Sequence, residues 1–184
     1  MWRNHVGRKE ERKLTTETMR ELGQAAEELL KERGPKYNMS NHEAEEKLRE
    51  LQKEESMEKV YVCSQYGSRG DKATNLELAK FFCMLVIEEG KIPICPHLFY
   101  SQVLNDDVKS QRAAGMRIGL DLLKDCMELR IFTGISEGMK GEILKAREWG
   151  IPITIANMAV IYSEDQAYYE EQEIVKELRE VLNG

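Results

Sequence analysis

The chain has 184 residues, of which 41% are apolar and 33% are charged, so it can form one domain of ordinary size with much solvated helical surface. Its net charge of -6 leaves no basic excess to neutralise phosphates, which argues against general nucleic-acid binding. No apolar run is long enough to cross a membrane, and the N-terminus lacks the apolar centre of a signal peptide, so we expect a cytoplasmic protein without membrane contact.

Residues 1–56 are predicted to form a helical extension of two amphipathic helices, at about 15–33 and 41–55. Apolar residues recur at helical spacing in the first helix, and a capping-box pattern begins the second at Ser40. Two helices of this length cannot form a core of their own. Their apolar stripes must pack on the main domain or on another subunit, and we slightly favour a homo-oligomer.

From residue 57 to residue 184 the pattern changes to short apolar runs that alternate with helices. The predicted strands span 59–63, 92–95, 129–133 and 151–155. The predicted helices span about 74–90, 109–126, 136–149 and 164–182, and a polar loop follows the second strand. Such alternation indicates one α/β domain with a parallel sheet and right-handed crossovers.

The four cysteines do not form a motif for metal binding or redox chemistry. Cys63, Cys83, Cys95 and Cys126 include no pair at C-x-x-C spacing, so we expect reduced thiols. Cys95 stands two residues before His97, but no further ligands follow at zinc spacing. The sequence therefore predicts neither a metal nor a cofactor.

The loop after the first strand is a candidate phosphate or ribose loop. Glycines such as Gly70 permit close approach of a ligand to the backbone, and Arg69 can bind a phosphate or a carboxylate. Asp71 or Asn75 can hold sugar hydroxyls. An ordinary glycine-rich turn explains the same residues about equally well.

Two further polar segments follow the second and third strands, and ligands of parallel sheets bind at this edge. His97 can contact a base or a sugar, or it can be a structural histidine that holds its loop. Ser136 can cap the next helix, whose first N–H groups favour an anion. Glu142 lies about one and a half turns into that helix, where spacing alone favours solvated charges at Glu137 and Glu142.

Taken together, these segments resemble the nucleoside 2-deoxyribosyltransferase-like family, in an uncharacterised branch of bacterial and phage proteins. The resemblance covers about residues 57–157. Its motifs are Tyr61-Val62-Cys63-Ser64, Tyr66, Arg69-Gly70-Asp71 and Asn75; Ile92-Pro93-Ile94 and Pro96-His97-Leu98; and Ile135-Ser136-Glu137-Gly138-Met139, Glu142-Ile143, Ala146 and Gly150-Ile151-Pro152. The resemblance implies a flavodoxin-like three-layer α/β fold, with a parallel sheet of four to five strands.

The resemblance also implies a reaction and a set of site residues. Gly138 and Glu142 keep the spacing of the family motif, so Glu142 is expected to attack C1′ of a deoxyribose and form a covalent glycosyl intermediate. A neighbouring acid or water would protonate the leaving base. The residues expected to bind substrate are Tyr66, Arg69, Gly70, Asp71, Asn75, His97, Ser136, Glu137, Gly138 and Met139.

Two departures from the transferase pattern are present, and the first of them shifts the expected substrate towards a nucleotide. Ser136 stands where transferases often carry an aspartate, and it resembles the phosphate-binding serine of 2′-deoxynucleoside 5′-monophosphate N-glycosidases. Arg69 resembles the phosphate-loop arginine of those enzymes. No clear counterpart of the transferases' helper aspartate is present, although Asp121 lies close in sequence.

Three functions follow from these observations. The first is cleavage or transfer of the N-glycosidic bond of a nucleoside or nucleoside 5′-monophosphate. The second is non-catalytic binding of a nucleotide or a nucleotide-derived signal, suggested by the missing helper acid. The third is a helical interaction protein in which the α/β domain is a scaffold for residues 1–56.

Overall fold

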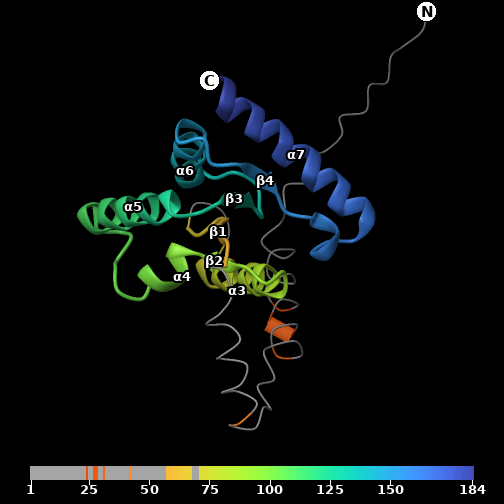
Figure 1. Cartoon of the computed structure of the whole chain (residues 1–184), viewed down its shortest axis with the longest axis horizontal. Helices are drawn as coiled ribbons and strands as arrows, with labels where there is room; N and C mark the ends of the chain where they lie inside the picture. The colour runs from red at the N-terminus through yellow and green to blue at the C-terminus, as the bar shows by residue number, and fades with distance from the viewer. Residues whose placement is uncertain (1–23, 25–26, 29–30, 32–41, 43–56, 68–70) are drawn as a thin grey trace, which may run out of the picture.

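A four-stranded, all-parallel sheet forms the centre of the molecule in the computed structural model, which describes residues 24, 27–28, 31, 42, 57–67 and 71–184. The strands are β1 (Lys59–Cys63), β2 (Ile92–Ile94), β3 (Glu128–Ile131) and β4 (Ile153–Ile155). Their order across the sheet is β2-β1-β3-β4 (Figure 1). This is the first part of the flavodoxin-like strand order.

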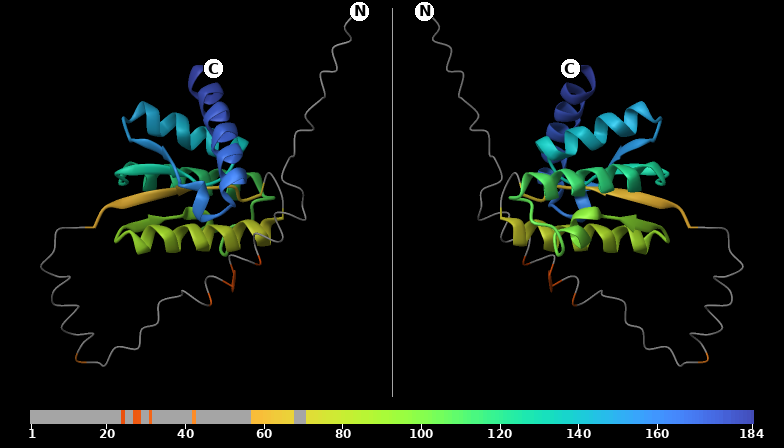
Figure 2. Two further views of the ribbon diagram at one scale, coloured as in Figure 1. Left: turned by 90° about the vertical axis from the view of Figure 1, so that its right-hand side faces the viewer. Right: turned by 90° about the vertical axis from the view of Figure 1, so that its left-hand side faces the viewer.

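Helices cover both faces of this sheet and make a three-layer α/β fold, as the sequence predicts. Figure 2 shows α3 on one side of the strands and α5 and α6 on the other. The helices are α3 (Lys72–Glu88), α4 (Pro96–Tyr100), α5 (Lys109–Lys124), α6 (Glu137–Glu148) and α7 (Glu164–Asn183), and a 3₁₀ turn, η1, spans Met158–Val160.

Two local predictions were wrong. Helix α3 begins at Lys72 because Asp71 is its N-cap, with Oδ2 accepting a hydrogen bond from the backbone N–H of Thr74 at 3.0 Å. Thr74, at the predicted start of this helix (74–90), therefore lies inside its first turn. The segment after β2 is also not a plain loop, since α4 begins at Pro96, and proline is well tolerated in the first turn of a helix.

The core lies between the sheet and its helices, and β1 is its centre. This strand pairs with β2 on one side and with β3 on the other, in parallel register. Val60 and Val62 are both about 1% exposed. On α3, Phe82 stacks on Phe132, which follows β3, with ring centroids 4.8 Å apart. Aromatic burial of this kind contributes strongly to core stability.

All four cysteines are free thiols in the structure. In the parts of the chain that the structure describes, no helix is both long and apolar enough to cross a membrane. The two predicted N-terminal helices and their role in oligomerisation fall almost entirely outside the described residues, so they stay predictions.

The Phe82–Phe132 stack makes a testable prediction about stability. Replacing Phe82, which is 1% exposed, with alanine leaves a cavity in the core and should lower the free energy of unfolding by about 3–5 kcal/mol. The matched control is Phe99→Ala, because Phe99 is 63% exposed and should cost less than about 1 kcal/mol. Urea unfolding followed by circular dichroism measures both values, and equal losses would contradict the assignment of the core.

Candidate active site

A pocket opens at the carboxyl ends of β1, β2 and β3, where the predicted ligand edge lies. From β1 the chain continues to β2 at one edge of the sheet, and from β3 it continues to β4 at the opposite edge. The crevice between β1 and β3 is therefore the topological switch point of the sheet. Residues that follow all three strands line the pocket, among them Ser64, His97 and Ser136. The three polar segments of the sequence therefore meet at one site.

The carboxylate of Glu142 lies in this pocket and is held by two donors from β1. The hydroxyl of Tyr61 donates to Oε1 at 2.7 Å, and the thiol of Cys63 donates to Oε2 at 3.4 Å. Tyr61 and Cys63 stand two residues apart on one strand, so their side chains point to the same face of the sheet. Glu142 is partly buried, so it is not the solvated helix charge that spacing alone favoured.

Gly119 on α5 gives this carboxylate and its donor the space that they occupy. A Cβ atom at this position would lie 3.0 Å from Oη of Tyr61 and 3.8 Å from Oε1 of Glu142. A separation of 3.0 Å between a carbon and an oxygen is tighter than ordinary van der Waals contact, so a side chain here would require the hydroxyl to shift by a few tenths of an ångström. The missing side chain of Gly119 thus permits the contact of Tyr61 with Glu142.

Burial changes the acidity of all three groups. It raises the pKa of Glu142 above the usual value of a glutamate, while the hydrogen bonds from Tyr61 and Cys63 act in the opposite direction. The pKa of the Tyr61 hydroxyl and that of the Cys63 thiol are raised well above their usual ranges, first by burial and then by the nearby carboxylate. Tyr61 and Cys63 are therefore protonated donors at neutral pH, and Glu142 is the group that titrates.

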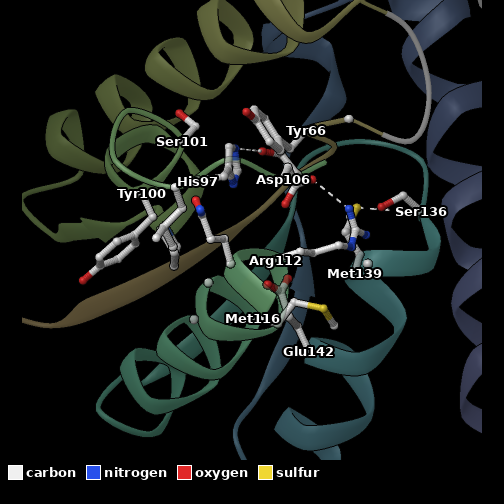
Figure 3. A pocket seen from close by; sticks show the side chains of 18 residues that line it. Tyr66, His97, Tyr100, Ser101, Asp106, Arg112, Met116, Ser136, Met139 and Glu142 are labelled. Carbon is white, nitrogen blue, oxygen red and sulfur yellow. Dashed lines mark hydrogen bonds and ion pairs between the residues drawn. The ribbon is translucent and has the colours of Figure 1, made fainter. Parts of the chain in front are cut away.

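His97 and Tyr66 form an aromatic wall of the pocket. Their rings stack with centroids 5.7 Å apart, and Nε2 of His97 lies 3.3 Å from Oγ of Ser64 (Figure 3). Burial lowers the pKa of His97 to about 4, so the imidazole is neutral at physiological pH. Both predicted roles of His97 are compatible with this position, since the ring holds its loop and also faces the pocket.

The first loop is only partly described, because Arg69 and Gly70 lie outside the described residues. Asp71 caps α3, and the side-chain amide of Asn75 donates to the carbonyl of Tyr66 at 2.9 Å. Neither side chain is among those that line the pocket. Their observed contacts hold the loop in shape, as expected if the segment is an ordinary glycine-rich turn.

The start of α6 contributes three of the predicted residues to the pocket. Ser136 is the N-cap of α6 and is 5% exposed, and Gly138 and Met139 line the cavity beside it. The backbone N–H of Ser136 lies 3.5 Å from the sulfur of Met139. Glu137 is not brought into the pocket, because it is exposed and pairs with Lys140 at 2.5 Å.

Several site residues were not assigned a role from the sequence. Tyr61 and Cys63 share a face of β1 beside the strand that leads to Glu142, and this alternation is a signal that could have identified them. Arg112 and Asp106 also line the pocket and pair at 2.7 Å. Asp121, the nearest candidate for a helper acid, is exposed and pairs instead with Lys124 at 2.8 Å.

Fold and site together define a parallel three-layer α/β protein with a carboxylate-bearing pocket at its switch point. A family described as "Domain of unknown function (DUF7768)" matches residues 58–156, which is more than half of the chain, and the chain belongs to this family. No curated protein and no solved structure matches the chain.

The space at Gly119 makes a second prediction. Gly119→Ala should push the Tyr61 hydroxyl away from Glu142, raise the pKa of Glu142 further, and lower the stability by about 1–3 kcal/mol. The control is Gly141→Ala, whose Cβ would meet nothing within 4 Å and which should stabilise α6 by about 0.5–1 kcal/mol. Carbon-13 NMR titration of the Glu142 carboxyl and urea unfolding measure both effects. An unchanged carboxyl titration in Gly119→Ala would contradict the proposed packing.

Proposed function

We propose that the protein cleaves or transfers the N-glycosidic bond of a nucleoside or a nucleoside 5′-monophosphate, with Glu142 as the nucleophile. The observation that carries this proposal is the carboxylate of Glu142, which two donors from β1 hold in the pocket at the switch point. Held in one orientation, a carboxylate has less entropy to lose when it reaches the transition state. The resemblance to deoxyribosyltransferases, given above, supplies the substrate class.

The two oxygens of Glu142 have different roles in the proposed reaction. Oε1 accepts the short hydrogen bond from Tyr61, whereas Oε2 has only the longer contact with the thiol of Cys63, a weak donor. Oε2 therefore keeps more of its electron density and attacks C1′. The bond between C1′ and the base nitrogen breaks, the base leaves with the electron pair, and water supplies its proton. Water or a second base then displaces Glu142 from C1′.

The raised pKa of Glu142 suits this role. A carboxylate that binds a proton more tightly is also a better nucleophile, provided that it is ionised at the working pH. Tyr66 and His97 offer a flat aromatic wall, which suits a nucleobase, and a neutral imidazole costs less to cover with a base than a charged one would.

Non-catalytic binding of a nucleotide or a nucleotide-derived signal is the second candidate. The specific observation that favours it is the position of Asp121, which is exposed, pairs with Lys124 and does not line the pocket. Among the described residues, the carboxylates that line the pocket are Glu142 and Asp106, and Asp106 is paired with Arg112, so such a pocket can bind a nucleotide without releasing its base. Turnover that depends on Glu142 separates the two candidates.

A cytoplasmic location and a homo-oligomeric state also belong to this proposal. Both come from the composition of the chain and from residues 1–56, most of which lie outside the described residues. The scaffold role for these residues, in which the α/β domain has no reaction of its own, predicts no base release from any nucleoside or nucleotide.

The nucleophile is tested with Glu142→Gln, which keeps the shape of the side chain and removes its charge. Wild-type protein should release free base from at least one member of a panel of nucleosides and 5′-monophosphates, and Glu142→Gln should reduce kcat by about 1,000-fold or more. Glu137→Gln, an exposed position on the same helix, should change kcat less than about 2-fold. Chromatography of the released base is the measurement. Equal rates for Glu142→Gln and wild type would rule out the nucleophile.

The pH dependence gives a further test, because only the ionised form of Glu142 attacks. Activity should fall as the pH drops through the pKa of Glu142, and this acid limb should lie above the pH expected for an exposed glutamate. Tyr61→Phe removes a donor that stabilises the carboxylate, so the limb should move to higher pH by about 1–2 units. Tyr168→Phe, at an exposed tyrosine of α7, is the control. A limb that stays in place in Tyr61→Phe would show that Tyr61 does not tune Glu142.

A further inference from the structure

Arg112 is the cation of the pocket. Among the described residues that line the cavity it is the sole lysine or arginine, whereas the acids Asp106 and Glu142 both line it. A single contact from Nη1 of Arg112 to Oδ2 of Asp106, at 2.7 Å, makes up the ion pair. Within the described part of the chain, no other group accepts from this guanidinium.

A guanidinium has five N–H donors in a planar fork, and one contact through Nη1 leaves Nε and Nη2 available. The side chain of Arg112 is 47% exposed, so these donors are open to a ligand. Figure 3 shows the side chain reaching from α5 across the pocket towards Ser136 and Met139. Arg112 and Glu142 therefore line the same cavity, so a ligand bound beside Glu142 lies in the space that Arg112 also borders.

We propose that Arg112 selects ligands that carry a phosphate monoester, and that Asp106 is the counter-ion that the phosphate displaces or shares. The inference rests on the proposed function and specifies its substrate class, which is the nucleoside 5′-monophosphate in preference to the free nucleoside. Phosphate oxygens match the spacing of the guanidinium fork and accept two parallel hydrogen bonds from it.

The electrostatics of the pocket favour this role over a purely structural ion pair. Glu142 and Asp106 would repel a phosphate, so a pocket that admits one needs a cation close to it. Asp106 comes from the connection between α4 and α5, and its side chain is 27% exposed, so water can solvate the carboxylate when the phosphate replaces it. Asp106 thus neutralises Arg112 and competes with a phosphate for it.

The first experiment compares affinities by isothermal titration calorimetry of the full chain, in a Glu142→Gln background that suppresses turnover. The probes are the four common 2′-deoxynucleoside 5′-monophosphates, the matching nucleosides, and deoxyribose 5-phosphate. Arg112→Gln should weaken monophosphate binding by about 10–100-fold and nucleoside binding by less than about 3-fold. Arg112→Lys keeps the charge but lacks the planar fork of the guanidinium. Its affinity for the monophosphates should lie between that of the parent protein and that of Arg112→Gln.

The matched control for Arg112 is Arg117→Gln, which makes the same change of charge on the same helix at an exposed position outside the pocket. It should leave both affinities within about 2-fold of the parent protein. Unfolding midpoints are compared first, and Arg112→Lys supplies the result if Arg112→Gln does not fold.

The second experiment tests the counter-ion. Asp106→Asn removes a competing charge and should strengthen monophosphate binding several-fold, by about the strength of one exposed ion pair, with nucleoside binding unchanged. Asp107→Asn is its control, because Asp107 is exposed and contacts Lys72 outside the pocket at 3.8 Å. If Asp106→Asn weakens nucleosides and monophosphates alike, Asp106 is a ligand for a sugar hydroxyl and the proposal is overturned.

The outcomes separate this inference from the proposed function. Monophosphate binding that depends on Arg112, without base release by the wild-type protein, supports the inference and removes the proposed function. Base release that depends on Glu142 but is equal for nucleosides and monophosphates, and insensitive to Arg112→Gln, overturns the inference alone. Failure of every phosphate-bearing probe to bind also overturns it.

Discussion

The hydrogen bond between Tyr61 and Glu142 is the interaction on which the site depends. It joins β1, the most buried strand of the sheet, to α6. Glu142 is partly buried, and Tyr61 is one of the two hydrogen-bond donors to its carboxylate. Without such donors, burial of this charge would favour the protonated acid or a rotation of the side chain into solvent. The parallel order of the strands makes the contact possible, because it brings the end of β1 beside the start of α6.

The fold follows closely from the pattern of the sequence, and the errors have local causes. Strand β1 was predicted at its exact limits because a strand buried on both faces tolerates few polar residues, whereas the predicted ends of β2, β3 and β4 differ from the observed ends by one or two residues. The start of α3 was misplaced because Asp71 and Thr74 are both good N-caps, and only the structure shows which one the helix uses. The five-residue helix α4 is too short to produce a periodic signal.

The candidate site was predicted in part. Glu142, Ser136 and His97 were identified because each follows a strand at the ligand edge or keeps a family spacing, and the pocket brings these three together. Tyr61, the partner of Glu142, was missed because their contact joins elements far apart in sequence, and the pairing of Arg112 with Asp106 was missed because it depends on the course of the connection before α5. No single-sequence pattern encodes such distances, although strand alternation does place Tyr61 on the face of β1 that meets α6.

The absent side chain at Gly119 has a consequence for comparing this chain with its relatives. Its Cβ position and Oη of Tyr61 compete for the same space, so the two positions are expected to vary as a pair. With alanine at the place of Gly119, the hydroxyl of a tyrosine at the place of Tyr61 would have to shift by a few tenths of an ångström, whereas phenylalanine there would have no such contact. The residue types at these two positions in other members of the family are therefore expected to show whether the hydroxyl–carboxylate contact is kept.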